Sequence, residues 1–137
     1  MNQNSSHIVI FDQEHRVLLI KRSPNDDWGA NLWALPGGTR KGNETLIQNI
    51  IREVKEETGL AIIPNKIRFL PEISKKLNHI FFMTDHFSGE ISLDDESSSY
   101  KWTKIEEIDA KNSVPGLKNE IFAAKMVLEQ PKIIVKL

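Results

Sequence analysis

The sequence predicts an α/β fold in which a mixed β-sheet lies between helices. Two observations support this prediction. Short runs of β-branched and apolar residues occur before and after a central segment with helical periodicity, and a second helical segment follows near the end of the chain. The 137 residues fit one domain, spanning 1–137, and would not hold two catalytic domains.

The expected strands are short apolar segments bounded by polar residues. The runs 7–11 and 17–20 are separated by the polar stretch 12–16, so we expect the two strands to form a β-hairpin. A loop with Pro and Gly breakers follows over 23–38. Beyond the central helix, further strand-like runs occur at 67–70, 80–83 and 100–103.

Two segments have the apolar spacing of helices. The first is expected over 44–58, where the apolar positions are Leu46, Ile47, Ile50, Ile51 and Val54. Gly59 stands where a left-handed C-terminal cap belongs. The second helix is expected after Pro115-Gly116, with an apolar stripe formed by Leu117, Ile121, Ala124 and Leu128.

Composition excludes several classes of function. A net charge of −1 provides no field for nucleic-acid backbones, so an anionic ligand must be met locally by a metal ion or a few side chains. The lack of cysteine excludes disulfides, thiolate metal sites and a cysteine nucleophile. No stretch approaches the ~20 apolar residues of a membrane span, and the N-terminus lacks a secretory signal. We therefore expect a cytoplasmic protein without a membrane partner.

Three carboxylates, Glu53, Glu56 and Glu57, stand at the edge of the apolar face of the central helix. At spacings of three and four residues they repel one another, and in the last turns they oppose the helix dipole. Such a local conflict often marks a functional site, and Mg²⁺ shared with substrate phosphates is the natural compensation. A solvated acidic face fits the helix alone equally well.

The residues around this helix complete a longer pattern. Gly38 is followed after five residues by Glu44, and after seven more by Arg52-Glu53-Val54-Lys55-Glu56-Glu57-Thr58-Gly59-Leu60. This pattern resembles the Nudix box of MutT-like hydrolases, and ordinary residue frequencies give an accidental match a probability on the order of 10⁻⁸. The resemblance implies an α/β/α sandwich and hydrolysis of a nucleoside diphosphate linked to another group, with Mg²⁺, or alternatively Mn²⁺, as the cofactor.

The resemblance also implies roles for the charged residues of the box. Glu53, Glu56 and Glu57 take the positions of the principal metal ligands. Arg52 is expected to orient Glu53 through charge-assisted hydrogen bonds. Glu44, which is expected to open the helix, suits either a catalytic role or the positive end of the helix dipole.

The two glycines before the helix are expected to shape the backbone of the site. Gly37 and Gly38 allow a tight turn that brings a carbonyl, assigned to Gly37, close to the metal. An ordinary turn would need the same two glycines, so this second interpretation stays open.

An acidic loop before Trp102 offers one further carboxylate. Glu96 resembles the loop glutamate that some MutT-like members use as an additional metal ligand or base, and Asp94 and Asp95 compete for this role. The general base is left open between Glu53, Glu96 and a metal-bound hydroxide, because crowded carboxylates titrate as a coupled set.

Residues outside the box decide the substrate. Arg22, Arg40 and Lys41 are candidate phosphate contacts, and each fits an ordinary surface role equally well. Asn119, near the start of the last helix, resembles the base-reading asparagine of MutT-like enzymes that hydrolyse 8-oxo-dGTP, since an amide can read a purine edge. A helix-capping role is the alternative for Asn119.

The first functional hypothesis is therefore a (d)NTP pyrophosphohydrolase that releases a monophosphate and pyrophosphate, with oxidised dGTP among the candidate substrates. The alternatives are hydrolysis of a dinucleoside polyphosphate or a nucleotide sugar, and a module that binds a nucleotide without cleaving it. In each case the partner is a small nucleotide rather than a long nucleic acid. The chain is expected to be a monomer or a homodimer.

Overall fold

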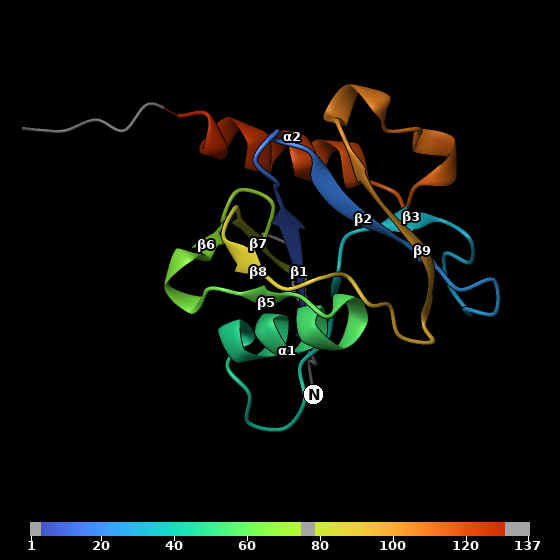
Figure 1. Cartoon of the computed structure of the whole chain (residues 1–137), viewed down its shortest axis with the longest axis horizontal. Coiled ribbons are helices and arrows are strands. Elements are labelled where there is room, and N and C mark those ends of the chain that lie inside the picture. The colour runs from blue at the N-terminus through green and yellow to red at the C-terminus, as the bar shows by residue number, and fades with distance from the viewer. Residues whose placement is uncertain (1–3, 75–78, 131–137) are drawn as a thin grey trace, which may run out of the picture.

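The strands lie between two helices, α1 (Leu46–Thr58) below them and α2 (Leu117–Leu128) above them in Figure 1. The computed structural model describes residues 4–74 and 79–130, and the rest of the predicted 1–137 domain lies outside these ranges. The prediction of an α/β fold with a mixed sheet between helices is confirmed. No helix within the described ranges is long and apolar enough to cross a membrane.

The strands of the described residues form three sheets. A four-stranded mixed sheet has the order β4-β1-β7-β6, and within it β1 and β7 run parallel while both edge strands pair antiparallel. Its strands are β1 (Ser5–Ile10), β4 (Gly37–Thr39), β6 (Arg68–Phe69) and β7 (His79–Thr84). The second sheet, β3-β2-β9, is antiparallel, as is the small β5-β8 sheet close to α1. Their strands are β2 (Val17–Arg22), β3 (Trp33–Ala34), β5 (Ala61–Ile62), β8 (Phe87–Ser88) and β9 (Ser97–Thr103).

The predicted hairpin between the first two strands is wrong. Phe11 and Val17 do meet in an isolated bridge, but β1 and β2 then separate into different sheets. The reason lies in the continuous apolar character of β1, in which neighbouring residues such as Ile8 and Val9 are both fully buried. A strand buried on both faces is best placed inside a sheet covered on each side, and β1 reaches this position between β4 and β7.

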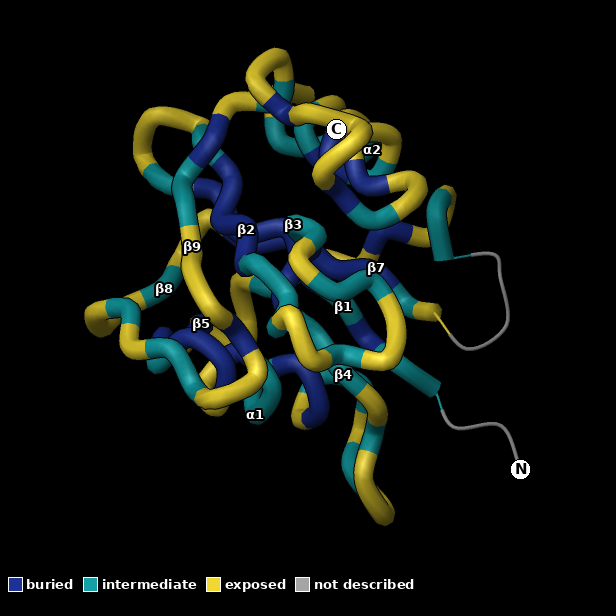
Figure 2. The backbone as a smooth tube through the Cα atoms, turned by 90° about the vertical axis from the view of Figure 1, so that its right-hand side faces the viewer, coloured by how far each residue is buried: buried dark blue, intermediate teal, exposed yellow. Residues whose placement is uncertain are grey.

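Two clusters of buried side chains fill the space on either side of the strands. The cluster next to α2 includes Val9, Phe11, Leu19, Met83, Leu117, Ile121 and Ala124. The cluster next to α1 includes Ile8, Ile10, Leu18, Ile50, Val54 and Leu60. In Figure 2 the buried backbone accordingly gathers between the two helices. Successive residues of β1 alternate between the clusters, so this strand joins both halves of the core.

Helix α1 begins two residues later than predicted. Thr45 is its N-cap, because the Thr45 hydroxyl accepts a hydrogen bond from the Gln48 N–H at 3.1 Å and the Gln48 side chain accepts one from the Thr45 N–H at 2.8 Å. This reciprocal capping box leaves Glu44 outside the helix, so the expectation that Glu44 opens it is wrong. At the other end Gly59 closes the helix with a φ of 79°, as predicted.

The later elements confirm the predictions with changed boundaries. Strands occur at all three predicted places, but β6 is shorter than its predicted run while β7 and β9 are longer. The apolar stripe of α2 faces the core as expected. The strands β3, β4, β5 and β8 were not predicted, because two or three residues are too few to show a period of two.

Candidate active site

Strand β4 brings two consecutive glycines against the C-terminal half of α1. The Gly37 N–H donates a hydrogen bond to Glu57 Oε1 at 3.1 Å. A Cβ atom on Gly38 would lie 2.6 Å from both carboxylate oxygens of Glu53, closer than side chains pack. On Gly37 a Cβ would lie 2.8 Å from the Nδ1 atom of His7. Gly38 therefore allows the backbone to approach the Glu53 carboxylate, whereas Gly37 is needed for the close approach of β4 to Ser6 and His7 on β1.

The carboxyl groups of Glu53 and Glu57 form a crowded, largely buried pair. Glu57 is only 6% exposed and the Glu53 side chain 12%. Burial raises the pKa of Glu57 well above its usual value, the Gly37 N–H opposes this, and the neighbouring Glu53 raises it again. Burial likewise raises the pKa of Glu53, against the effect of Arg52. The pair has a high electrostatic cost that a bound cation would remove.

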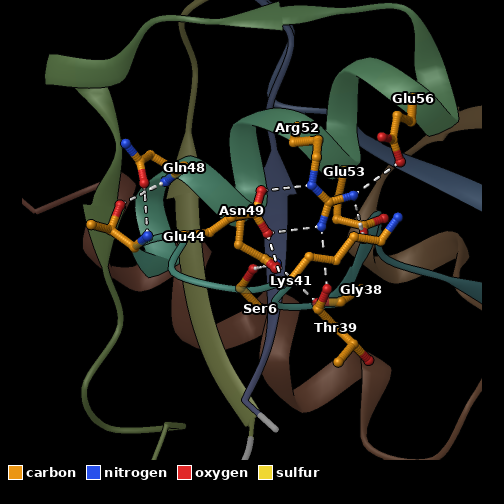
Figure 3. Close-up of polar contacts among 11 residues, drawn as sticks. Ser6, Gly38, Thr39, Lys41, Glu44, Gln48, Asn49, Arg52, Glu53 and Glu56 are labelled. Atoms are coloured by element: carbon orange, nitrogen blue, oxygen red, sulfur yellow. Dashed lines mark hydrogen bonds and ion pairs between the residues drawn. The ribbon is translucent and has the colours of Figure 1, made fainter.

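Arg52 is the centre of a network of ion pairs shown in Figure 3. Its Nε and Nη2 atoms bind the two carboxylate oxygens of Glu44 at 2.6 and 3.0 Å. Its Nη1 atom lies 3.1 Å from Glu53 Oε1 and 3.0 Å from Glu56 Oε2. Arg52 thus stands where it can orient Glu53, a role that stays a prediction. The Glu56 side chain is 50% exposed and turned toward Arg52, so the structure does not bring it into the Glu53 and Glu57 pair.

The ion pair of Glu44 makes stability depend on pH. The hydrogen bonds from Arg52 and then from the Lys41 N–H lower the pKa of Glu44 from 4.5 to about 2. A depressed folded-state pKa contributes stability above pH 4.5 that is lost as the pH falls toward 2. We expect Glu44→Gln to lower the melting temperature at pH 7 by roughly a few degrees, and the difference from wild type to shrink by pH 3.

Thermal unfolding followed by circular dichroism at the two pH values measures this effect. Glu14→Gln is a suitable control, because Glu14 is exposed and its contact with Arg16 is 3.6 Å long. An equal difference between wild type and Glu44→Gln at pH 7 and pH 3 would contradict the assignment.

Two cavities meet at Glu57, one member of the carboxylate pair. The larger, about 710 Å³, has Trp28, Phe81 and Val114 in its walls. The smaller, about 420 Å³, is more polar. Gly37 and Glu57 line both cavities, so they stand at the junction.

Some of the site residues predicted from the sequence line the two cavities, and others do not. Arg22 lines both cavities, with its Nε donating to the Trp28 carbonyl at 2.9 Å and its Nη2 atom 3.3 Å from Asp26. Asn119 lines the larger cavity from the first turn of α2. Glu96 lines the smaller cavity. Arg40, in contrast, lies in the loop before α1 and lines neither of these two cavities.

The acidic loop before β9 approaches the carboxylate pair with more than one residue. Asp95 and Glu96 both line the smaller cavity together with Glu57. The charge of Asp94 contributes to raising the pKa of Glu57. All three acids of the loop therefore remain candidates for the additional carboxylate.

Two histidines of the larger cavity were not singled out from the sequence. The rings of His7 and His79 stack with their centroids 5.4 Å apart, and His7 Nε2 lies 3.2 Å from His79 Nδ1. Burial, followed by the charges of His79 and Arg22, lowers the pKa of His7 to about 4. The two histidines are 72 positions apart in the sequence, and the parallel pairing of β1 with β7 brings them together.

The donor set at the junction suits Mg²⁺. Within residues 4–74 and 79–130, no three His, Cys, Asp or Glu side chains are arranged to enclose an ion by themselves. Magnesium commonly binds through one or two carboxylates and completes its coordination with water and substrate phosphate oxygens. Glu53 and Glu57, held together in a partly buried place beside two glycines, fit this mode of binding.

Comparisons with known proteins agree with this fold. The family model described as the NUDIX domain matches residues 1–124. An 8-oxo-dGTP diphosphatase of Buchnera aphidicola is 30% identical over 102 residues, which cover 74% of this chain and 77% of the relative. An ADP-ribose pyrophosphatase of Methanocaldococcus jannaschii is 34% identical over 96 residues, or 64% and 54% of the two chains. The crystal structure of a MutT protein from Methanosarcina mazei superposes with a TM-score of 0.75 at 26% identity, covering 93% of this chain and 96% of the other.

Proposed function

This chain belongs to the Nudix family of hydrolases, and on that premise we propose that it hydrolyses a phosphoanhydride bond in a nucleoside diphosphate linked to another group, with Mg²⁺ as the cation. One observation carries the proposal. Glu53 and Glu57 form a buried carboxylate pair against the Gly37-Gly38 backbone, and Glu57 of this pair stands with Gly37 at the junction of two cavities. A phosphate chain lying across this junction would place its two ends in different cavities.

Some residues of the site are proposed to bind the cation, and others to orient the residues that bind it. Glu53 and Glu57 would hold the cation, with the Gly37 carbonyl and Glu96 as further ligands. When bound, Mg²⁺ neutralises phosphate oxygens and makes a water molecule more acidic. Arg52 keeps Glu53 in place through their 3.1 Å contact.

Glu56 is also proposed as a ligand of the cation, but its side chain is placed differently from those of Glu53 and Glu57. Its side chain is exposed and its ion pair with Arg52 can be exchanged for the cation by rotation of the side chain. Glu56 is therefore proposed as a ligand that competes with its own ion pair, whereas the two buried carboxylates need no rearrangement.

The larger cavity is proposed to hold the base of a (d)NTP. Trp28, which is exposed, provides an aromatic face for a heterocycle, and Asn119 offers both a donor and an acceptor. Arg22 lines both cavities, so its guanidinium can bind phosphate oxygens where the phosphate chain passes from one cavity into the other. Oxidised dGTP stays a candidate, supported by the similarity to an 8-oxo-dGTP diphosphatase.

The smaller cavity favours a second candidate substrate, a nucleotide sugar. Asp95, Glu96 and Ser97 line this cavity, and carboxylates and hydroxyls readily bind the hydroxyl groups of a sugar. The similarity to an ADP-ribose pyrophosphatase supports this alternative.

Product identification tests the proposal. The protein is incubated with Mg²⁺ and a panel of dNTPs, oxidised dGTP, dinucleoside polyphosphates and nucleotide sugars. Release of a monophosphate and pyrophosphate from a dNTP would support the first candidate, and release of a monophosphate and a sugar phosphate the second. If no member of the panel is cleaved with either Mg²⁺ or Mn²⁺, the proposed function is rejected.

Asn119→Ala tests how the base is recognised. Loss of one hydrogen bond to the base, about 1.4 kcal/mol, should raise KM for the preferred nucleotide roughly tenfold and change KM for the other bases less. Steady-state kinetics on four nucleotides measure the difference. Asn65→Ala is the control, because Asn65 is exposed and lines neither cavity. An equal rise for all bases would remove Asn119 from base recognition.

A further inference from the structure

Asn49 is a fully buried amide on α1, one helical turn before Glu53. Its Nδ2 atom donates to the Ser6 hydroxyl on β1 at 2.9 Å and to the Gly38 carbonyl on β4 at 3.0 Å, as Figure 3 shows. Its Oδ1 atom has no hydrogen-bond partner among the described residues. Asn49 thus links the helix to two strands and leaves one buried acceptor unsatisfied.

The orientation of this amide follows from the chemistry of its partners. A backbone carbonyl can only accept a hydrogen bond, so the nitrogen of Asn49 must face Gly38. This orientation isolates Oδ1, and a buried acceptor without a partner destabilises the folded state. An apolar side chain would remove this unsatisfied acceptor, but it would also lose the two hydrogen bonds and leave the Ser6 hydroxyl unpaired. What the asparagine supplies at this position is therefore the pair of bonds that tie α1 to the two strands.

The bond to Gly38 acts on the backbone that both buried carboxylates touch. The Gly38 Cα lies against the Glu53 carboxylate, and the N–H of the preceding Gly37 binds Glu57. A small shift of β4 away from α1 would lengthen both contacts at once.

We propose that Asn49 is a positioning residue, which holds the Gly38 carbonyl against α1 and thereby sets the Gly37-Gly38 backbone relative to Glu53 and Glu57. This role rests on the proposed function, because Glu53 and Glu57 are the carboxylates that are proposed there to hold the cation. The bond to Ser6, in contrast, anchors the same amide to β1 without touching the carboxylate pair.

The two hydrogen bonds of Asn49 can be separated by mutation. Asn49→Leu removes both bonds and keeps the branched shape of the side chain, although leucine is the larger residue, and Ser6→Ala removes only the bond to β1. Mn²⁺ binding to each folded protein is measured by calorimetry, with melting temperatures and kcat/KM recorded beside it. Asn49→Leu is expected to weaken Mn²⁺ binding by about tenfold or more, as loss of residues that orient metal ligands typically does, whereas Ser6→Ala should change it less than about twofold.

The combined variant Ser6→Ala with Asn49→Leu keeps the test decisive if Asn49→Leu alone does not fold. It leaves no unpaired polar side chain at the Ser6 and Asn49 positions, so we expect it to fold while it binds Mn²⁺ as weakly as Asn49→Leu. Wild-type affinity in a folded Asn49→Leu or combined variant would overturn the positioning role. So would an equal loss in Ser6→Ala. Wild-type protein that binds no Mn²⁺, even with a nucleotide present, would overturn the proposed function as well.

Discussion

Glu57→Gln is expected to reduce kcat/KM at least about a hundredfold while the protein stays folded, because the neutral amide removes the anionic oxygen proposed to hold the cation. The amide oxygen can still accept the hydrogen bond from the Gly37 N–H. Since Glu57 is buried beside Glu53, removal of its charge should leave the melting temperature equal to that of the wild type or raise it. Loss of activity together with retained stability would therefore show that Glu57 acts in the reaction and not in folding.

Steady-state kinetics with saturating Mg²⁺ and thermal unfolding measure the two effects. Glu53→Gln and Glu56→Gln belong to the same series, and both are expected to lose most activity. Glu107→Gln is the matched control, because it is an exposed glutamate on the short 3₁₀ helix Ile105–Glu107, outside both cavities. Near-normal turnover in all three box variants would refute the assignment of the metal site.

Gly38→Ala should have a comparable effect for a steric reason. The added methyl would collide with the Glu53 carboxylate, since its two oxygens would lie 2.6 Å from the new Cβ atom. Either the carboxylate or β4 must move, so we expect kcat/KM to fall at least about a hundredfold. Overpacking of this kind also costs about 1–3 kcal/mol in the free energy of unfolding.

Gly42→Ala separates the steric effect from the general cost of replacing a glycine. Gly42 has a φ of 53°, but a Cβ atom at this position would meet no atom within 4 Å beyond its chain neighbours. We expect this variant to lose about 1 kcal/mol of stability through backbone strain and to keep its activity. Denaturant unfolding and kcat/KM measure both. A Gly38→Ala variant as active as Gly42→Ala would show that the close approach of β4 to Glu53 is dispensable.

The elements with local signals could be predicted from the sequence. The apolar spacing of α1, its Gly59 cap and the stripe of α2 follow from the 3.6-residue period and from the conformational freedom of glycine, which are properties of neighbouring residues. The box of glycines and charged residues pointed to hydrolysis before any contact was known, because its spacing repeats the pattern of a family. The place of Asn49 was also accessible in principle, since it precedes Glu53 by one helical turn on the same stripe.

Contacts between distant segments were decided only by the tertiary structure. The parallel pairing of β1 with β7 replaced the expected hairpin and brought His7 beside His79, and the approach of β4 to α1 set Gly38 against Glu53. A periodic pattern shows which face of a strand or helix is buried, but it does not show which other segment covers that face. The sequence by itself therefore determined the helices, the family and the candidate ligands, whereas strand partners, side-chain directions and the two cavities depended on packing between segments far apart in the chain.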